Sequence, residues 1–152
     1  MRITRVFAFA LVALLAALPA LASEKKVFEK SYSFGEKEQK IGIKVDDVVI
    51  ESFRIRNWPD AEDFEKAEKD LNDTHTMVVE FTYSNRDLDH DYKCTYTVTI
   101  PGKDGKPYGT NDRTATLDKG KVDDTNKMFV KMRTNEYKAA KKIEIKFEIW
   151  RK

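Results

Sequence analysis

The stretch that decides the fold is TMVVEFTYSNRDLDHDYKCTYTVTI, residues 76–100. In each half of it apolar side chains alternate with polar ones, and the apolar sets are Met77, Val79, Phe81 and Tyr83, then Cys94, Tyr96, Val98 and Ile100. A period of two residues is typical of strands that bury one face, because successive side chains point to opposite sides of a strand. The sequence therefore predicts two such strands, joined by an acidic hairpin connection over residues 84–91.

The same alternation recurs along the rest of the chain, over residues 26–34, 41–45, 48–56, 127–133 and 143–149, and residues 108–117 are predicted as the strand that returns after a hairpin turn. Within 48–56 the apolar phase slips between Ile50 and Phe53, which predicts a β-bulge. The pair Asp104-Gly105 predicts a hairpin turn, since glycine adopts a positive φ at little cost. Seven or eight strands with such turns predict an all-β fold, an antiparallel two-sheet sandwich, with a closed barrel as the alternative.

Two segments have helical features. Residues 60–71 place Phe64, Ala67 and Leu71 on one face and acidic residues in the first turn. This pattern predicts either a short helix packed over one end of the sandwich or a flexible acidic excursion. Residues 134–140 predict one helical turn, with Tyr137 as the side chain that pins it to the core.

The N-terminus has the pattern of a secretory signal peptide. Arg2 and Arg5 precede an uncharged apolar run over residues 6–18, and small residues lead up to Ala22, after which we expect cleavage. The run is shorter than the roughly 20 residues that a bilayer core requires, which disfavours a membrane anchor. The sequence thus predicts a cleaved signal peptide, residues 1–22, and a single exported domain, residues 23–152, in the periplasm or outside the cell.

Removal of the signal peptide leaves a domain of balanced charge. Of the 28 basic residues Arg2 and Arg5 are lost, so the mature domain has 26, which equals its 26 acidic residues and gives no argument for nucleic acid binding. Residues 46–91 contain 14 acidic and 5 basic residues, whereas residues 92–152 contain 8 acidic and 15 basic ones. Either strand pairing interleaves these charges, or an acidic edge or the loops dock a protein partner, with an association that salt weakens.

Several short motifs of the second half occur together in one known type of domain. They are Phe81-Thr-Tyr-Ser-Asn85, the strand 94–100, Asp104-Gly105, Leu117-Asp-Lys-Gly120 and an apolar strand that contains Phe129. With them, residues 76–130 resemble the immunoglobulin-like β-sandwiches of small exported bacterial proteins, in particular the FxLYD type. The chain departs from this type in its acidic insertion, 60–73, and in having Val98-Thr99-Ile100 where the type has a Tyr-Asp pair. The resemblance implies an immunoglobulin-like fold and a binding or accessory role, and it implies no catalytic residue.

The acidic connection contains one candidate metal site. If it is extended, the side-chain oxygens of Asn85, Asp87, Asp89 and Asp91 lie on one side of the backbone. Calcium binds about six to eight oxygen ligands and could combine such a row with backbone carbonyls. An EF-hand is excluded, because no frame of the segment supplies the required glycine and glutamate. The alternative is a solvated turn that breaks the strand.

Catalytic signals are absent from the sequence. It contains no Gly-x-Ser-x-Gly elbow, no glycine-rich phosphate loop and no His-Glu-x-x-His motif. Cys94 is the sole cysteine and lies on an apolar strand face, which predicts a buried free thiol. His75 and His90 flank one strand, too far apart to share a metal, and are expected at the surface.

These observations together predict a non-catalytic exported protein. We expect a binding or accessory module that recognises a protein or a cell-envelope component, with no cofactor and no stable membrane anchor after signal removal. The alternative is a calcium-binding or small-ligand-binding protein that uses the acidic connection 85–91.

Overall fold

The computed structural model describes residues 24–58 and 74–152. These residues form eight strands, one 3₁₀ turn and one short helix, with the bounds β1 Lys26–Ser33, β2 Gln39–Val45, β3 Val48–Trp58, β4 Thr74–Asn85, β5 Tyr92–Ile100, η1 Lys103–Gly105, β6 Gly109–Leu117, β7 Lys121–Arg133, α2 Thr134–Ala139 and β8 Lys142–Arg151. The predicted signal peptide, 1–22, and the helix expected over 60–71 lie outside the described residues.

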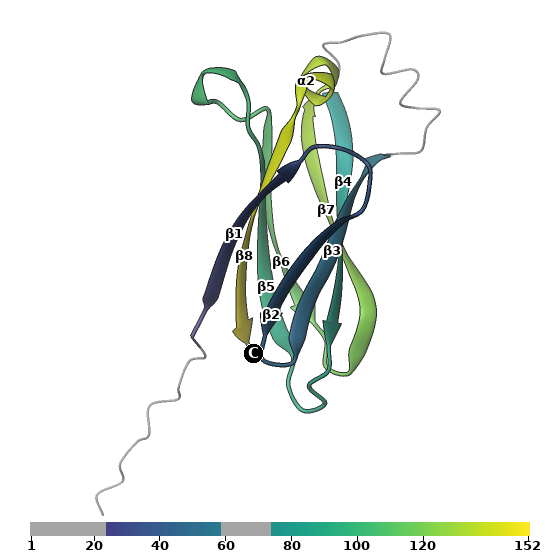
Figure 1. The fold of residues 1–152 in the computed structure, drawn as a ribbon, viewed down its shortest axis with the longest axis vertical. Helices are drawn as coiled ribbons and strands as arrows, with labels where there is room; N and C mark the ends of the chain where they lie inside the picture. The colour runs from purple at the N-terminus through teal and green to yellow at the C-terminus, as the bar shows by residue number, and fades with distance from the viewer. Residues whose placement is uncertain (1–23, 59–73) are drawn as a thin grey trace, which may run out of the picture.

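The strands form two four-stranded antiparallel sheets that face each other, which confirms the predicted β-sandwich (Figure 1). Sheet A has the order β1-β8-β5-β6, and sheet B has the order β2-β3-β4-β7. The prediction that β4 and β5 form a hairpin is wrong, because β4 pairs with β3 and β7 while β5 pairs with β6 and β8. Residues 86–91 therefore carry the chain from one sheet to the other.

The core explains why β4 and β5 nevertheless stand at the centre of the fold. Phe81 of β4 stacks on Tyr96 of β5, with ring centroids 4.3 Å apart. Both rings also contact Phe147 of β8 edge-on, at 5.9 Å. All three side chains are almost fully buried. The alternating residues of the opening stretch thus meet across the sandwich, face to face, where aromatic burial contributes most to stability.

Polar side chains join the two sheets along both open sides of the sandwich. On one side Asn111 donates to the carbonyl of Phe129 at 2.7 Å, and Arg113 donates to the carbonyl of Lys127. On the other side Lys30 of β1 donates to the carbonyl of Ile41 in β2, also at 2.7 Å. Inward-pointing charged side chains on edge strands occupy carbonyls that would otherwise pair with another chain.

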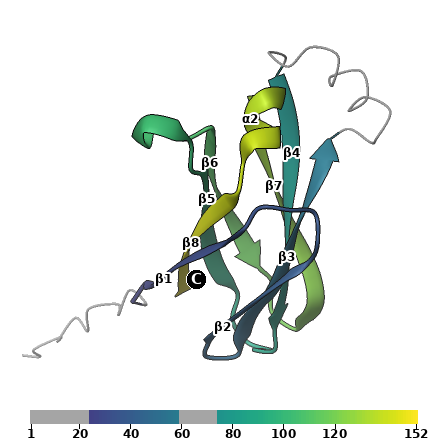
Figure 2. The same cartoon turned by 45° about the horizontal axis from the view of Figure 1, so that its top comes forward.

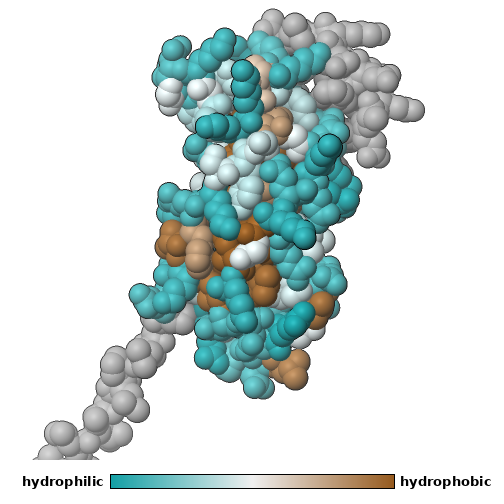
Figure 3. Space-filling view, in the orientation of Figure 1, coloured by the Kyte–Doolittle hydropathy of each residue, from teal (hydrophilic) through white to brown (hydrophobic). Residues whose placement is uncertain are grey.

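The β1 and β2 side is the less completely covered of the two. Figure 3 shows apolar side chains that reach the surface near the start of β1. Val27 is exposed there, and Phe28 and Tyr32 are only partly buried although they pack against the core. On the opposite side β6 approaches β7 so closely that a Cβ on Gly109 would lie 2.9 Å from the carbonyl oxygen of Lys131.

The local predictions from turns and bulges are mostly confirmed. The register of β3 against β4 shifts between Ile50 and Ser52, at the predicted bulge. Asp104 and Gly105 have positive φ in the turn between β5 and β6, which projects beyond the sandwich (Figure 2). Strand β7, however, begins at Lys121 rather than at residue 127, because its exposed first half pairs with β4 without burying apolar side chains.

The predicted helical turn is present as α2. Its first turn is capped by Glu136, whose carboxylate accepts the backbone N–H of Arg133 at 2.8 Å. Tyr137 packs against Phe34 and His75, at ring distances of 5.2 and 4.4 Å, which confirms its predicted role. Among residues 24–58 and 74–152, no helix is long and apolar enough to cross a membrane.

Candidate functional site

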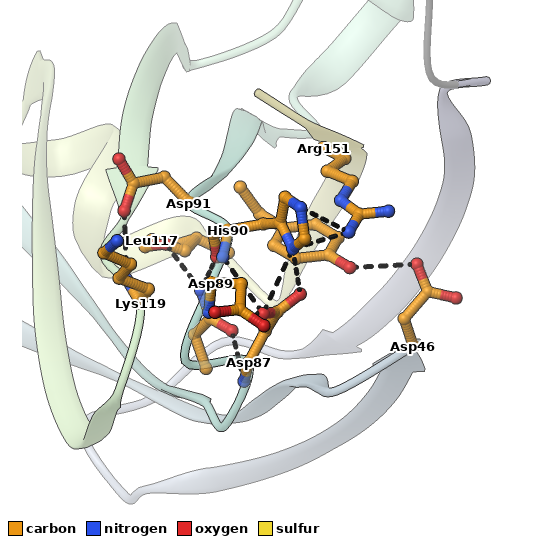
Figure 4. Close-up of polar contacts among 10 residues, drawn as sticks. Asp46, Asp87, Asp89, His90, Asp91, Leu117, Lys119 and Arg151 are labelled. Atoms are coloured by element: carbon orange, nitrogen blue, oxygen red, sulfur yellow. Dashed lines mark hydrogen bonds and ion pairs between the residues drawn. The ribbon is translucent and has the colours of Figure 1, made fainter. Parts of the chain in front are cut away.

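The acidic connection between β4 and β5 lies at the end of the sandwich where the C-terminus also lies (Figures 1 and 4). Its first residue, Asn85, is fully buried. The Asn85 side-chain amide donates to the carbonyls of His90 and Leu117, at 3.1 and 2.9 Å, and its oxygen accepts the N–H of Asp87. Asn85 therefore fastens the connection to the end of β6 and faces the protein interior, away from any solvent-exposed ligand.

Asp87 folds the connection into a turn. Its carboxylate accepts the N–H groups of Asp89 and His90, at 2.8 and 3.0 Å, and lies 3.0 Å from the His90 ring. These hydrogen bonds, led by the one from Asp89, lower the pKa of Asp87. A carboxylate that accepts neighbouring backbone N–H groups is the usual way in which aspartate stabilises a turn.

Asp91 ties the connection to two other segments. Its carboxylate accepts the N–H of Lys119 at 3.1 Å and lies 3.5 Å from the ammonium group of Lys152. The hydrogen bond from Lys119, with the charge of Lys152, lowers the pKa of Asp91. The backbone takes part as well, since the carbonyl of Asp91 accepts the N–H of Lys152 and that of Asp87 accepts the N–H of Gly120.

The four predicted calcium ligands do not form a row. The connection is bent, so Asn85 points inward. Asp87 points toward its own turn and Asp91 toward the β6–β7 turn (Figure 4). In the part of the chain that the structure describes, no group of three or more histidine, cysteine, aspartate or glutamate side chains could hold a metal ion. Calcium binding at Asn85, Asp87, Asp89 and Asp91 stays a prediction, for which the extended geometry assumed in the sequence is not found.

The two histidines lie at opposite ends of β4, as expected. His90 lies against the guanidinium of Arg151 and the carboxylate of Asp87. His75 is not a surface residue, because it is 3% exposed, and its ring contacts the side-chain oxygen of Asn57 at 3.1 Å. Burial lowers the pKa of His75. Its position beneath Tyr137 explains the burial that the sequence prediction missed.

A different charged cluster lies on the outer face of sheet B. Glu80 of β4 is only 5% exposed, although its side chain points away from the core. Arg54 donates to one carboxylate oxygen through Nε at 2.9 Å and Nη2 at 2.5 Å, and Arg56 donates to the other at 2.6 Å. Lys127 of β7 lies 3.5 Å from the same carboxylate. Three cations therefore surround one carboxylate, and each of them is about half exposed.

The surroundings of Glu80 determine its charge. Burial would raise the pKa of Glu80, but the hydrogen bond from Arg54 and the charges of Arg56, Arg54 and Lys127 outweigh it and lower the pKa. Glu80 is thus a fixed anion that orients the two guanidinium groups. Their remaining N–H donors suit further carboxylate or phosphate oxygens.

The sequence contains a signal for this cluster that only the strand register reveals. Arg54 and Lys127 both stand opposite Glu80 in the pairing of β3, β4 and β7. The three residues are distant in the sequence, and their alternation alone marks them only as outward-facing. Of the acidic half of the chain, the described strands β3 and β4 are inner strands of sheet B and do not form an edge. Partner docking through the acidic loops stays a prediction.

The outer face of sheet A is different in character. It has a shallow polar depression of about 500 Å³, lined by residues of β1, β5 and β8 that include Glu29, Ser31, Thr97, Thr99, Glu144 and Lys146. Lys146 pairs with Glu148 at 2.8 Å, and Thr95 hydrogen-bonds to Thr114 at 2.7 Å. Polar groups of this face thus find partners in neighbouring residues of the same face.

No protein-family model matches the chain. No curated protein is significantly similar to it either. The resemblance to immunoglobulin-like FxLYD domains therefore stays a prediction, and functional inference depends on the geometry of the described residues.

Proposed function

We propose that the chain is an exported, non-catalytic binding module that recognises a protein or another component of the cell envelope. The outer face of sheet B is its recognition surface in this proposal. Export follows from the signal-peptide pattern of residues 1–22. The immunoglobulin-like resemblance supports the same kind of role.

The observation that carries the proposal is the cation cluster around Glu80. Isolated surface ion pairs contribute little to stability when exposed. Here Arg54, Arg56 and Lys127 share one carboxylate, and each keeps about half of its side-chain surface in contact with solvent. The cluster therefore has unneutralised positive charge in a fixed position.

The placement of the reactive side chains supports a role without catalysis. Burial raises the pKa of the Cys94 thiol to about 12, so the thiolate that a nucleophilic cysteine needs is disfavoured. His75 is buried against Asn57 and Tyr137. The His90 ring lies against the Asp87 carboxylate and the Arg151 guanidinium, whereas the Cys94 thiol is fully buried on the core face of β5.

The test has two stages, of which the first concerns export. The tagged chain is produced in a bacterial host, cells are fractionated, and the N-terminus of the exported form is sequenced. We expect recovery outside the cytoplasm with Ser23 as the first residue. Recovery of the intact N-terminus in the cytoplasm would contradict export.

The second stage concerns binding. The exported chain is immobilised and exposed to a solubilised envelope fraction, beside a variant with R54Q, R56Q and E80Q, which removes the cluster without leaving a buried charge unpaired. We expect a discrete component that the wild-type chain retains and the variant loses. Retention of no component by the wild type would contradict a binding role, and equal retention by the variant would move the site away from sheet B.

A further inference from the structure

The basic character of sheet B extends beyond the cluster around Glu80. Besides Arg133 at the end of β7, strand alternation places six cationic side chains on its outer face, namely Lys40 and Lys44 of β2, Arg54 and Arg56 of β3, and Lys127 and Lys131 of β7. All six residues are exposed. The lysines lie on the two edge strands, β2 and β7, and the arginines lie on β3, next to β4. The outward side chains of β4 are small apart from Glu80 and Val78.

The acidic residues within this face do not neutralise it. Glu80 is shared by Arg54, Arg56 and Lys127, as described above. The other acids nearby, Glu38 and Glu51, accept hydrogen bonds from the hydroxyls of Ser52 and Ser84, both at 2.5 Å. Among the described residues Lys40, Lys44 and Lys131 have no ion-pair partner within 4.0 Å. Glu38, Glu51 and Glu80 thus set three formal negative charges against the six cations, and the face has a net positive charge.

The cations repeat with the period of an extended chain. Residues two apart on one strand, such as Arg54 and Arg56, are separated by about 6.6–6.8 Å, since a strand rises about 3.3–3.4 Å per residue. An extended peptide presents alternate side chains at the same interval. Acidic residues at every second position of such a peptide would therefore meet Arg54 and Arg56 on β3, and acidic residues at every fourth position would meet Lys127 and Lys131 on β7.

The contacts of the two arginines indicate which class of anionic ligand suits this face. Arg54 and Arg56 already bind a carboxylate, that of Glu80, through only some of their N–H groups. A bilayer-binding face would need several apolar side chains for insertion beside its cations. The exposed large apolar residues in the described part of sheet B are Phe129, at 40%, and Val122, at 55%, both on β7. Carboxylates of a protein segment thus fit the face better than a lipid surface.

We infer that the outer face of sheet B binds an extended, acidic segment of a partner protein, whose Asp and Glu carboxylates contact Arg54, Arg56 and the surrounding lysines. The inference rests on the proposed function and specifies the chemistry of its partner. Binding of this kind is electrostatic and weakens as salt screens the charges.

The experiment measures fluorescence anisotropy of a labelled peptide of alternating Glu and Ser, with the same peptide of alternating Gln and Ser as reference. The protein is the exported chain. The test variant combines K40Q, K44Q and K131Q, which spares the buried Glu80. The control variant combines K103Q, K106Q and K142Q, which makes the same change in net charge at exposed positions outside sheet B. Circular dichroism melts verify that both variants fold.

We expect the wild type to bind the Glu peptide, to ignore the Gln peptide, and to lose affinity between about 20 and about 150 mM salt. The sheet B variant should bind about tenfold more weakly, while the control stays within about twofold of the wild type. An equal loss in the control would show attraction by net charge alone and overturn the inference. The wild type could also bind phosphatidylglycerol vesicles more strongly than the Glu peptide, and the sheet B variant could lose that vesicle binding. This result would assign the face to membranes and would also overturn the inference.

Failure of this inference can be told apart from failure of the proposed function. If the wild type retains a discrete envelope component and the variant with R54Q, R56Q and E80Q retains it equally, a binding role at another surface stands and the acidic-segment inference fails. If the wild type retains none and also ignores the Glu peptide, both fail.

Discussion

The acidic connection 85–91 and the basic face of sheet B are both clusters of charge, and they differ in whether the chain itself uses their groups. The oxygens of Asn85, Asp87 and Asp91 accept N–H groups of the connection itself and of the β6–β7 turn. On sheet B, three cations share the single carboxylate of Glu80 and keep N–H donors in reach of solvent. The polar groups of the acidic connection are thus used by hydrogen bonds within the fold, whereas the basic face keeps donors that a partner can use.

This difference shows why residue type and spacing alone do not identify a site. A row of Asn and Asp residues has the composition of a cation site, but the same oxygens are the best acceptors for the backbone N–H groups of a turn. Where these oxygens already accept backbone N–H groups, a cation can bind only if the hydrogen bonds of the turn are broken. Unused donors on a rigid sheet require no such rearrangement.

The largest effect is expected at Asn85, where the acidic connection enters the core. The change Asn85→Ala leaves the carbonyl of Leu117 and the N–H of Asp87 without their partner. Because unpaired buried polar groups each cost about 1–3 kcal/mol, we expect the free energy of unfolding to fall by about 3 kcal/mol. Urea denaturation measures this change.

Asp89→Ala is the matched control for Asn85→Ala, since Asp89 is exposed at the tip of the same connection. Its effect should lie within about 0.5 kcal/mol. Comparable losses in the two variants would mean that the connection is held by its acidic side chains together and not by Asn85.

A smaller effect is expected when Glu80 is changed to glutamine. The change removes the anion that orients Arg54 and Arg56, so three cations repel one another. Since the cations are half exposed and screened, we expect a loss of about 1–2 kcal/mol in the same denaturation assay. The variant with R54Q, R56Q and E80Q should recover part of it, because only Lys127, whose side chain is half exposed, then keeps its charge. A larger loss in the triple variant would contradict this account.

The fold was predictable where the information is local, and less so where it depends on distant pairing. Alternation located the inward side chains of β4, β5 and β8, and the phase slip at Ile50 located a bulge that the register confirms. The assignment of β4 and β5 to one hairpin failed, because six connecting residues suit a hairpin as well as a crossing between sheets. The contact that decides the crossing, from Asn85 to the Leu117 carbonyl, joins residues 32 apart.

The cation cluster was less predictable still. Arg54, Glu80 and Lys127 meet only because the registers of two strand pairs coincide at Glu80. In the sequence each of them is an ordinary outward residue of a half-buried strand. An outward glutamate that is 5% exposed is a property of the assembled sheet, and no period along the chain reports it.

The pH dependence of the free energy of unfolding should distinguish the contribution of Glu80 from that of the acidic connection. The pKa of Glu80 is lowered in the folded state, so its charge contributes stability above the ordinary glutamate value, about 4.3, and this contribution is lost as the pH falls through the folded pKa. We expect E80Q to flatten the decline of stability below about pH 4.5.

The carboxylates of the connection also take part in acid unfolding. The pKa values of Asp87 and Asp91 are lowered too, so the wild type should continue to lose stability at acid pH after Glu80 is neutralised. Thermal melts of wild type, E80Q and Asp87→Asn over this range measure the separate shares. If E80Q leaves the slope of stability against pH unchanged, the charges around Glu80 are already screened by solvent.

The smallest effect is expected from calcium. A site with a dissociation constant of about 1 mM would stabilise the fold by about 1.4 kcal/mol at about 10 mM calcium, which a melt detects readily. Since the oxygens of Asn85, Asp87 and Asp91 are engaged by N–H groups, we expect no shift in the melting temperature and no heat in calorimetry. A shift that Asp87→Asn abolishes would show that the ion opens the turn, and the acidic connection would then be a ligand site as the basic face is proposed to be.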